Sequence, residues 1–168
     1  MPLRGGADSE SKHIVMPGTQ RVSKEKGELA EAAFLHKATE LGFIVSKPWG
    51  DSAKYDFMVD GWGQISRVQV KSCATMRDGR AYAFNTYRRT CGVAVPYYPG
   101  EIDVFACYVV PEDAWYIMPV KDCALKKCLR VSPQAPERDR LYGKFREAWQ
   151  WLGTEVVMPQ RGRGAQSG

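Results

Sequence analysis

The segment Tyr55–Ser72, YDFMVDGWGQISRVQVKS, decides the fold of this chain. It reads as two strands joined by a turn around the letters GWG. Because side chains alternate across a strand, each strand has one apolar side and one more polar side. In the second strand Gln69 and Lys71 share the polar side, while the valines that flank Gln69 share the other. This alternation predicts a β-hairpin with one buried face.

The polar side of this hairpin gathers functional groups at one end. We expect Asp60 to face Ile65 across the turn. The same antiparallel register then brings Asp56 opposite Gln69, and directly opposed residues lie about 5 Å apart at Cβ. Lys71 is the next residue on that face. The register therefore predicts that a carboxylate, an amide and an ammonium group converge.

A further carboxylate comes from the preceding helix, which is predicted from about residue 23 to the stop at Gly42. At 100° per residue, Glu31 lies about 60° from Phe34, at the margin of the apolar face, and Glu28 lies about 120° away. A carboxylate at such a margin needs a partner, because unpaired burial is costly. Glu31 is therefore expected either to form a salt bridge with a nearby lysine or arginine or to belong to the site.

The other predicted elements complete an α/β protein with a central mixed β-sheet flanked by helices. We expect one domain over residues 23–155, a flexible arm over 1–22 and a flexible basic tail over 156–168. The remaining strands are predicted at Phe43–Ser46, Ala81–Thr86, Ile102–Val110 and Ala114–Met118, and a final helix at Arg138–Leu152.

Composition sets limits on function. The 168 residues include 24 Lys and Arg against 19 Asp and Glu, a net charge of +5, which favours an anionic partner but also suits an ordinary basic protein. Five cysteines with no C-x-x-C pair and only two histidines argue against a His-rich zinc site and suit reduced thiols in a cytoplasmic protein. No membrane segment or signal peptide is expected.

The segments KGELAEAAF, YDFMVD and RVQVKS together resemble the core of the PD-(D/E)xK nuclease superfamily. The chain is most similar to the group I intron-associated, homing-type endonucleases, and Holliday-junction resolvases are more distant relatives. A later segment, YYPGEIDVFACYVVPEDAWYIMP, resembles the following strands of the same branch. The resemblance covers most of residues 26–119 and implies a restriction-endonuclease-like core.

The resemblance also implies catalytic roles. Glu31 matches the carboxylate of the first helix, Asp56 the strand aspartate, and Lys71 the lysine of the motif. Gln69 stands at the (D/E) position, where this branch also tends to show Q-x-K. Tyr55 replaces the proline that usually precedes the aspartate. Gln69 in place of the usual acid removes one anionic ligand and should lower the metal affinity of the site.

The implied cofactor is Mg²⁺, with Mn²⁺ as a substitute, because phosphodiester hydrolysis builds negative charge that a divalent ion offsets. The expected oxygen ligands are Glu31, Asp56, the amide of Gln69 and the carbonyl of Val70. Lys71 would orient the attacking water. Gln69 could simply fill space beside the metal, and we favour this role because the superfamily usually has an acid at this position. Alternatively, its amide could donate a hydrogen bond to Asp56 or to a phosphate.

A window between residues 77 and 98 interleaves basic and aromatic side chains, as in surfaces that neutralise phosphates. A two-stranded ribbon there could enter a groove of double-stranded DNA. The alternative is an ordinary solvated sheet face. The predicted DNA contacts are Arg77, Arg80, Tyr82, Arg88 and Arg89.

These expectations favour a metal-dependent DNA endonuclease, site-specific and homing-type. Because cutting both strands of a duplex takes two symmetry-related sites, we expect a homo-oligomer, either a dimer or a tetramer. Two alternatives stay open: a junction resolvase that reads branched shape, and a non-catalytic DNA-binding module on the same fold, which Gln69 would permit.

Overall fold

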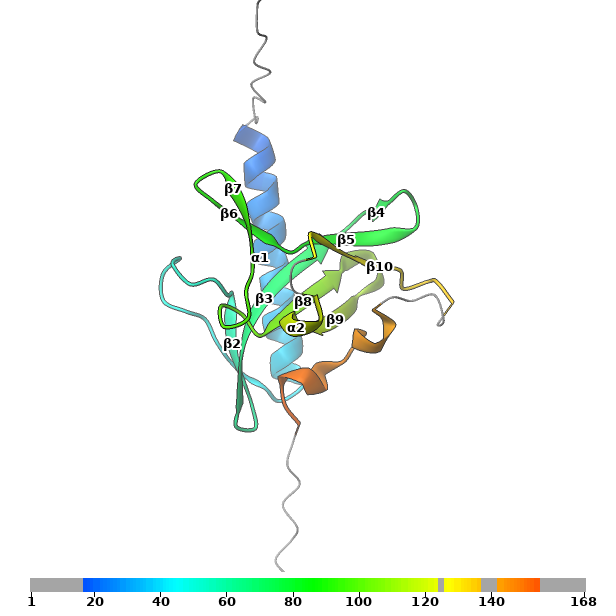
Figure 1. Cartoon of the computed structure of the whole chain (residues 1–168). Helices are drawn as coiled ribbons and strands as arrows, with labels where there is room; N and C mark the ends of the chain where they lie inside the picture. Colours follow the sequence, from blue (N-terminus) through cyan, green and yellow to red (C-terminus); the bar gives the residue numbers. More distant parts are fainter. Residues whose placement is uncertain (1–16, 124–125, 137–141, 155–168) are drawn as a thin grey trace, which may run out of the picture.

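A five-stranded mixed sheet forms the centre of the molecule in the computed structural model, which describes residues 17–123, 126–136 and 142–154. Its strand order is β1-β2-β3-β8-β9, with β3 and β8 parallel and the other neighbours antiparallel. One long helix, α1, packs across one face of this sheet (Figure 1). The predicted α/β class with a mixed sheet is confirmed. The strands are β1 (Ile44–Ser46), β2 (Phe57–Gly61), β3 (Gln64–Cys73), β8 (Val104–Val109) and β9 (Ala114–Pro119).

The β2–β3 hairpin has the predicted register. Asp60 pairs with Ile65, and Phe57 pairs with Val68. The turn is tight because its two central residues, Trp62 and Gly63, both have positive φ, as a two-residue hairpin turn requires. The Asp60 carboxylate accepts a hydrogen bond from the Gly63 amide at 2.9 Å, which holds the turn closed.

Helix α1 spans Pro17–Glu40, so it begins within the predicted N-terminal arm, six residues before the predicted start. It ends at the predicted glycine: Gly42 adopts φ +87°, and its amide donates to the Thr39 carbonyl. The Phe43 amide donates to the Ala38 carbonyl at 3.1 Å, which completes a Schellman motif. The buried face of α1 packs on the sheet through Ala30, Phe34 and Ala38.

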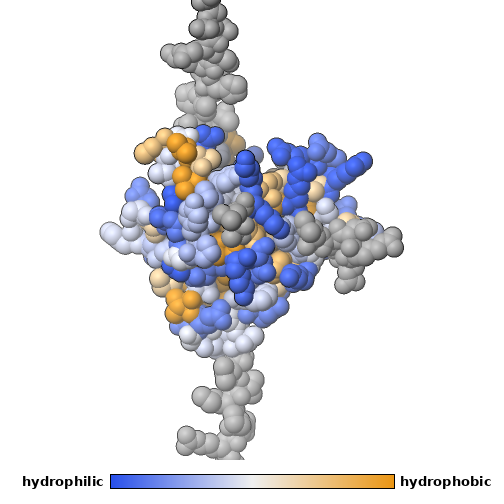
Figure 2. Space-filling view, in the orientation of Figure 1, coloured by the Kyte–Doolittle hydropathy of each residue, from blue (hydrophilic) through white to orange (hydrophobic). Residues whose placement is uncertain are grey.

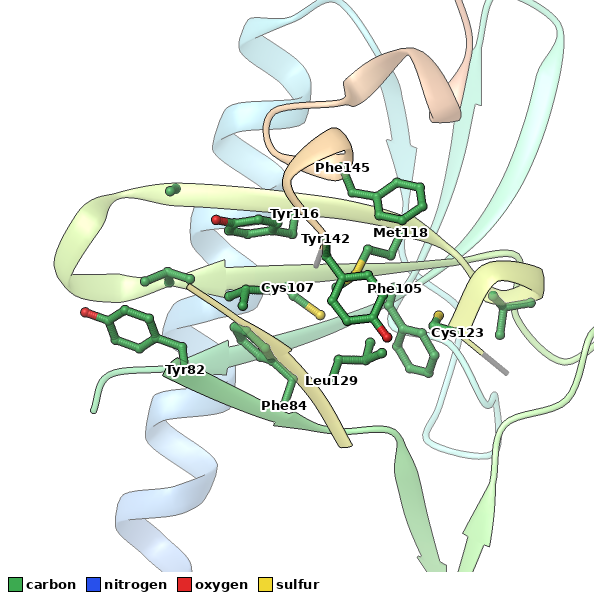
Figure 3. Close-up of a cluster of buried hydrophobic side chains, with 14 of the residues drawn as sticks. Tyr82, Phe84, Phe105, Cys107, Tyr116, Met118, Cys123, Leu129, Tyr142 and Phe145 are labelled. Atoms are coloured by element: carbon green, nitrogen blue, oxygen red, sulfur yellow. The ribbon is translucent and has the colours of Figure 1, made fainter. Parts of the chain in front are cut away.

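The opposite face of the central sheet is covered by a second, three-stranded sheet of order β10-β5-β4. A cluster of buried side chains fills the space between the two sheets, with Phe84, Phe105 and Leu129 near its centre (Figure 3). A separate ribbon, β6–β7, leads back to the central sheet. These strands are β4 (Met76–Arg77), β5 (Ala81–Asn85), β6 (Tyr87–Thr90), β7 (Val93–Pro96) and β10 (Cys128–Val131).

The predicted final helix at Arg138–Leu152 is wrong for the described part of that range. Two short 3₁₀ turns, η3 (Gly143–Phe145) and η4 (Trp149–Leu152), stand there, and residues 137–141 lie outside the described chain. Between the turns, Glu147 has positive φ, and its backbone amide donates to the Trp115 carbonyl at 2.8 Å. The Glu147 carboxylate accepts from the Trp115 amide at 2.6 Å. The chain thus pairs with the outer edge of β9, the last strand of the sheet, which a continuous helix could not do.

The apolar residues of this C-terminal segment are nevertheless buried as expected, namely Phe145, Ala148, Trp149 and Leu152. Two short helices complete the fold: η1 (Val110–Glu112) between β8 and β9, and α2 (Val120–Cys123) after β9. All five cysteines are free thiols. Among the described residues, no helix combines the length and apolar character needed to cross a membrane. Most of the predicted arm and all of the predicted tail lie outside the described residues.

Candidate active site

Asp56 stands immediately before β2, and its carboxylate is fixed to the neighbouring strand. Its Oδ2 atom accepts hydrogen bonds from the Val70 amide at 2.7 Å and from Gln69 Nε2 at 2.5 Å. Burial raises the pKa of this carboxyl, the Val70 amide lowers it, and the charge of Glu31 raises it further. Because both bonds go to Oδ2, the other carboxylate oxygen remains available for a ligand.

Gln69 is the nearest partner of Asp56, as the hairpin register predicted. Its side chain is buried, with 8% of the residue exposed. Of the two roles considered for Gln69, the structure shows the donor role, because an ionised carboxylate can only accept hydrogen bonds. The amide oxygen of Gln69 takes no part in that bond and is the oxygen that could serve a metal.

Lys71 lies two residues after Gln69 in β3, so its side chain is on the same face of the strand. Burial lowers the pKa of its ammonium group, and the charge of Asp56 opposes that shift. Its Nζ atom lies 5.3 Å from the centroid of the Tyr97 ring. Among the described residues, the Lys71 ammonium group has no hydrogen-bond or ion-pair partner, although its backbone belongs to the β3–β8 ladder. The positive charge is therefore placed beside the carboxylate but is not neutralised by direct pairing.

Glu31 enters the site from α1 with the orientation that the helical spacing predicts. Its side chain is 25% exposed, whereas that of Glu28 is 60% exposed. Glu31 also has the salt-bridge partner that was considered for it, because Lys47 Nζ lies 2.7 Å from its Oε2. The same interaction raises the pKa of Lys47. A divalent ion bound by Glu31 would therefore compete with Lys47.

One cleft contains these groups. It has a volume of about 720 Å³ and lies between the middle of α1, residues 23–31, and the C-terminal half of β3. The cleft is lined by all four predicted catalytic residues, Glu31, Asp56, Gln69 and Lys71, and by Val70. Residues more than 30 positions apart in the sequence thus converge on one surface depression.

The donor atoms in this cleft suit a hard divalent cation. Two carboxylates, one amide oxygen and the Val70 carbonyl are all oxygen donors, which Mg²⁺ prefers. Within the described chain, no group of three or more His, Cys, Asp and Glu side chains could hold a metal. Any ion here would have at most two anionic ligands and would depend on neutral oxygens and water for the rest.

The predicted DNA contacts are distributed over two hairpins. Arg77 and Arg80 are exposed on the β4–β5 hairpin, where Figure 2 shows a hydrophilic projection. Arg89 is exposed on the β6–β7 ribbon. Tyr82, by contrast, is 4% exposed and packs in the core between the two sheets. The prediction that Tyr82 contacts DNA is wrong, because the alternation of side chains in β5 directs Tyr82 into the core.

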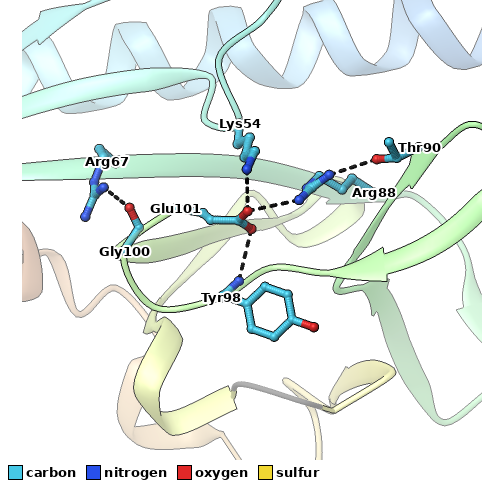
Figure 4. A network of polar contacts seen from close by, with 7 residues as sticks. All are labelled: Lys54, Arg67, Arg88, Thr90, Tyr98, Gly100 and Glu101. Atoms are coloured by element: carbon cyan, nitrogen blue, oxygen red, sulfur yellow. Dashed lines mark hydrogen bonds and ion pairs between the residues drawn. The ribbon is translucent and has the colours of Figure 1, made fainter.

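Arg88 also differs from expectation. It lies only 22% exposed and pairs with Glu101, with Nη2 3.0 Å from Oε1 (Figure 4). Glu101 pairs with Lys54 at 2.5 Å through the same oxygen. One carboxylate, that of Glu101, is therefore paired with two cations, Arg88 and Lys54. Arg88 holds the β6–β7 ribbon against the body of the protein, and Arg89 is the predicted DNA contact that remains exposed on this ribbon.

Two features of the site were not found from the sequence. Lys47 was not identified as the partner of Glu31, and Tyr97 was not identified as the neighbour of Lys71. Asp103, just before β8, has a structural role: its carboxylate accepts two hydrogen bonds from the Arg67 guanidinium, both at 2.9 Å. This interaction lowers the pKa of Asp103.

Comparison with known proteins agrees with this geometry. The family model for PD-(D/E)XK endonucleases matches residues 22–152. Among solved structures, the chain is similar to the bacterial homing endonuclease I-Ssp6803I, with a TM-score of 0.67 and 29% sequence identity over 76% of this chain and 90% of that one. A search of curated proteins found no match. The restriction-endonuclease-like core and the resemblance to the homing-type branch are confirmed, and the chain belongs to the PD-(D/E)XK endonuclease family.

Proposed function

We propose that this nuclease is a divalent-metal-dependent, site-specific DNA endonuclease of the homing type. The observation that carries the proposal is the convergence of Glu31, Asp56, Gln69 and Lys71 in one cleft. Its likeness to a bacterial homing endonuclease supports the same class of substrate. Membership of the endonuclease family supports hydrolysis within a strand, away from its ends.

The proposed metal ligands are Glu31, Asp56, the Gln69 amide oxygen and the Val70 carbonyl. When bound, Mg²⁺ supplies Lewis-acid chemistry at a phosphate oxygen, and Mn²⁺ can take its place. With only two carboxylates, the site suits one ion held with modest affinity. An ion bound by Glu31 would weaken the contact of its Oε2 with Lys47, and a lysine released there would be able to meet a phosphate.

Lys71 and Asp56 have complementary roles in the proposal. Asp56 is held by the Val70 amide and Gln69, so its position needs no rearrangement when DNA arrives. Lys71 brings a positive charge toward the phosphate, where negative charge accumulates in the transition state. Burial makes that charge more effective, because the surrounding medium screens it less than water would.

DNA is proposed to lie across the cleft, with the two exposed hairpins beside it. Arg77, Arg80 and Arg89 would neutralise phosphates, and their contribution would weaken as the salt concentration rises. A homo-oligomer would supply the second active site that cutting both strands requires.

Sequencing the DNA ends released from a fragmented genomic library, with Mg²⁺ and without it, tests this proposal. We expect Mg²⁺-dependent ends that cluster at one extended sequence. Preferential cutting of cruciform DNA over linear duplex would instead support the resolvase alternative. Binding without cleavage in either Mg²⁺ or Mn²⁺ would support the non-catalytic module.

A further inference from the structure

Tyr97 is the side chain that contacts the Lys71 ammonium directly. The Nζ atom of Lys71 lies 5.3 Å from the centroid of the Tyr97 ring, within the range of a cation–π interaction. Resting on the proposed function of this cleft, we propose that Tyr97 is a positioning residue for the nuclease reaction, whose ring holds the Lys71 ammonium at the place where it meets the scissile phosphate.

A lysine with no direct ion pair needs such a support. Its long side chain has many rotamers, and ordering it costs entropy. A carboxylate in the place of Tyr97 would order Lys71 but would also neutralise the charge that the phosphate needs. An aromatic face attracts the ammonium without cancelling its charge. The ring of Tyr97 therefore orders Lys71 and leaves its positive charge available to DNA.

The Tyr97 ring is itself held rigidly. The residue is 6% exposed, and its ring packs edge-on against Phe105 with the centroids 5.5 Å apart and the planes at 87°. Phe105 is the register partner of Gln69 across β3 and β8. The Tyr97 ring is therefore packed against a residue that pairs directly with β3, the strand that carries Gln69 and Lys71. Burial raises the pKa of the Tyr97 hydroxyl to about 12, with the charge of Asp56 the next cause. The ring is therefore neutral at working pH.

The turn that follows Tyr97 is clamped at both ends (Figure 4). Glu101 Oε2 accepts from the Tyr98 amide at 3.2 Å, while its Oε1 pairs with Arg88 and Lys54. At the other end, the Gly100 carbonyl accepts a hydrogen bond from the Arg67 guanidinium. These contacts leave the segment before β8 little freedom, so the ring stays over Lys71.

Two substitutions separate this role from simple core packing. Tyr97→Phe keeps the ring face, and Tyr97→Leu removes it. At saturating protein and Mg²⁺, we expect the single-turnover cleavage rate of Tyr97→Phe to stay within about twofold of wild type, and that of Tyr97→Leu to fall about thirtyfold, which is the scale of a desolvated cation–π contact. DNA affinity measured without metal should be unchanged in both variants.

Tyr142→Leu is the matched control. Tyr142 is 5% exposed and belongs to the same buried cluster, but its ring faces Lys126 instead of Lys71. It should lose comparable thermal stability and keep the wild-type cleavage rate below its unfolding transition. An equal rate loss in both leucine variants, or a tenfold loss in Tyr97→Phe, would overturn the positioning role.

A spectroscopic measurement keeps the inference testable without any activity. In protein labelled with ¹³C-lysine, the ε-protons of Lys71 should show an upfield ring-current shift in wild type and in Tyr97→Phe, and the Lys71→Arg variant assigns the signal. The shift should disappear in Tyr97→Leu. An unshifted Lys71 signal in the wild-type protein would overturn the inference even if the leucine variant fails to fold. If the shift is present and the wild type cleaves no DNA, the proposed function fails instead.

Discussion

Replacing Gln69 by glutamate should destabilise the metal-free protein in a way that depends on pH. Gln69→Glu puts a second carboxylate at the position from which an amide nitrogen now donates to Asp56 at 2.5 Å. Two ionised carboxylates this close repel each other strongly in a buried site. The pair can avoid that repulsion by taking up one proton, which then bridges the two groups.

The cost of that proton sets the magnitude. Protonating a carboxyl with an ordinary pKa of about 4.3 at pH 7 costs about 3.7 kcal/mol, which is an upper limit for the loss of stability. Burial already raises the pKa of Asp56, so the cost falls below this limit. We therefore expect the free energy of unfolding of Gln69→Glu to be about 2–3 kcal/mol below wild type at pH 7 without divalent ions.

The sign of the pH dependence follows from the same argument. The carboxyl pair has a raised pKa in the folded variant, so the folded state binds a proton that the unfolded state has lost. The destabilisation is complete above the raised pKa and shrinks as the pH falls towards about 4, the pKa of an unfolded carboxyl. Saturating Mg²⁺ should also recover stability, because the ion binds the added carboxylate only in the folded state.

Urea unfolding from pH 5 to pH 8, with EDTA and with Mg²⁺, measures these effects. Gln134→Glu is the matched control, because the Gln134 amide also donates to a carboxylate, that of Glu112 at 3.1 Å, but on the exposed surface. Solvent screening should keep the loss in Gln134→Glu under about 1 kcal/mol at every pH. If Gln69→Glu in EDTA at pH 7 loses no more than this control, Gln69 does not donate to a charged Asp56.

Three further predictions follow from particular contacts. Glu31→Gln should weaken Mg²⁺-dependent cleavage far more than Glu28→Gln, because only Glu31 lines the cleft; similar losses in parallel metal titrations would remove Glu31 from the site. Arg89→Ala should reduce the log–log salt slope of DNA binding by about one, whereas Arg88→Ala should lower the melting temperature, because Arg88 is already paired with Glu101; an equal slope change in both would contradict this assignment. Gly61→Ala should lower the melting temperature, because a Cβ at Gly61 would collide with the Leu152 carbonyl; an unchanged melting temperature would show that the C-terminal turn is not packed there.

Local periodicity accounts for what could be predicted from the sequence. The hairpin register follows from strand alternation and a short turn, and it placed Asp56 beside Gln69 correctly. The 100° spacing of a helix ordered Glu31 and Glu28 correctly by exposure. In both cases the residues lie within one element or one hairpin, where backbone geometry allows few arrangements.

Contacts between distant segments could not be predicted in this way. The parallel pairing of β3 with β8 brings Tyr97 to Lys71, 26 positions away, and no local pattern encodes that meeting. Arg88 has the charge of a phosphate contact, but its partner Glu101 lies outside strand β6, in the turn before β8. The spacing of Phe145, Ala148 and Leu152 suits a helix, yet the backbone between them forms hydrogen bonds with the outer edge of β9 instead.

We propose that this cleft hydrolyses DNA with a divalent ion held by Asp56. The most direct test is a Mg²⁺ titration of nicking of a supercoiled plasmid by wild type and by Asp56→Asn, with circular dichroism to show that both are folded. We expect nicking that rises with Mg²⁺ for the wild type, and a rate at least about 10²-fold lower for Asp56→Asn at every concentration. Nicking by the folded asparagine variant at a rate close to that of wild type would contradict it.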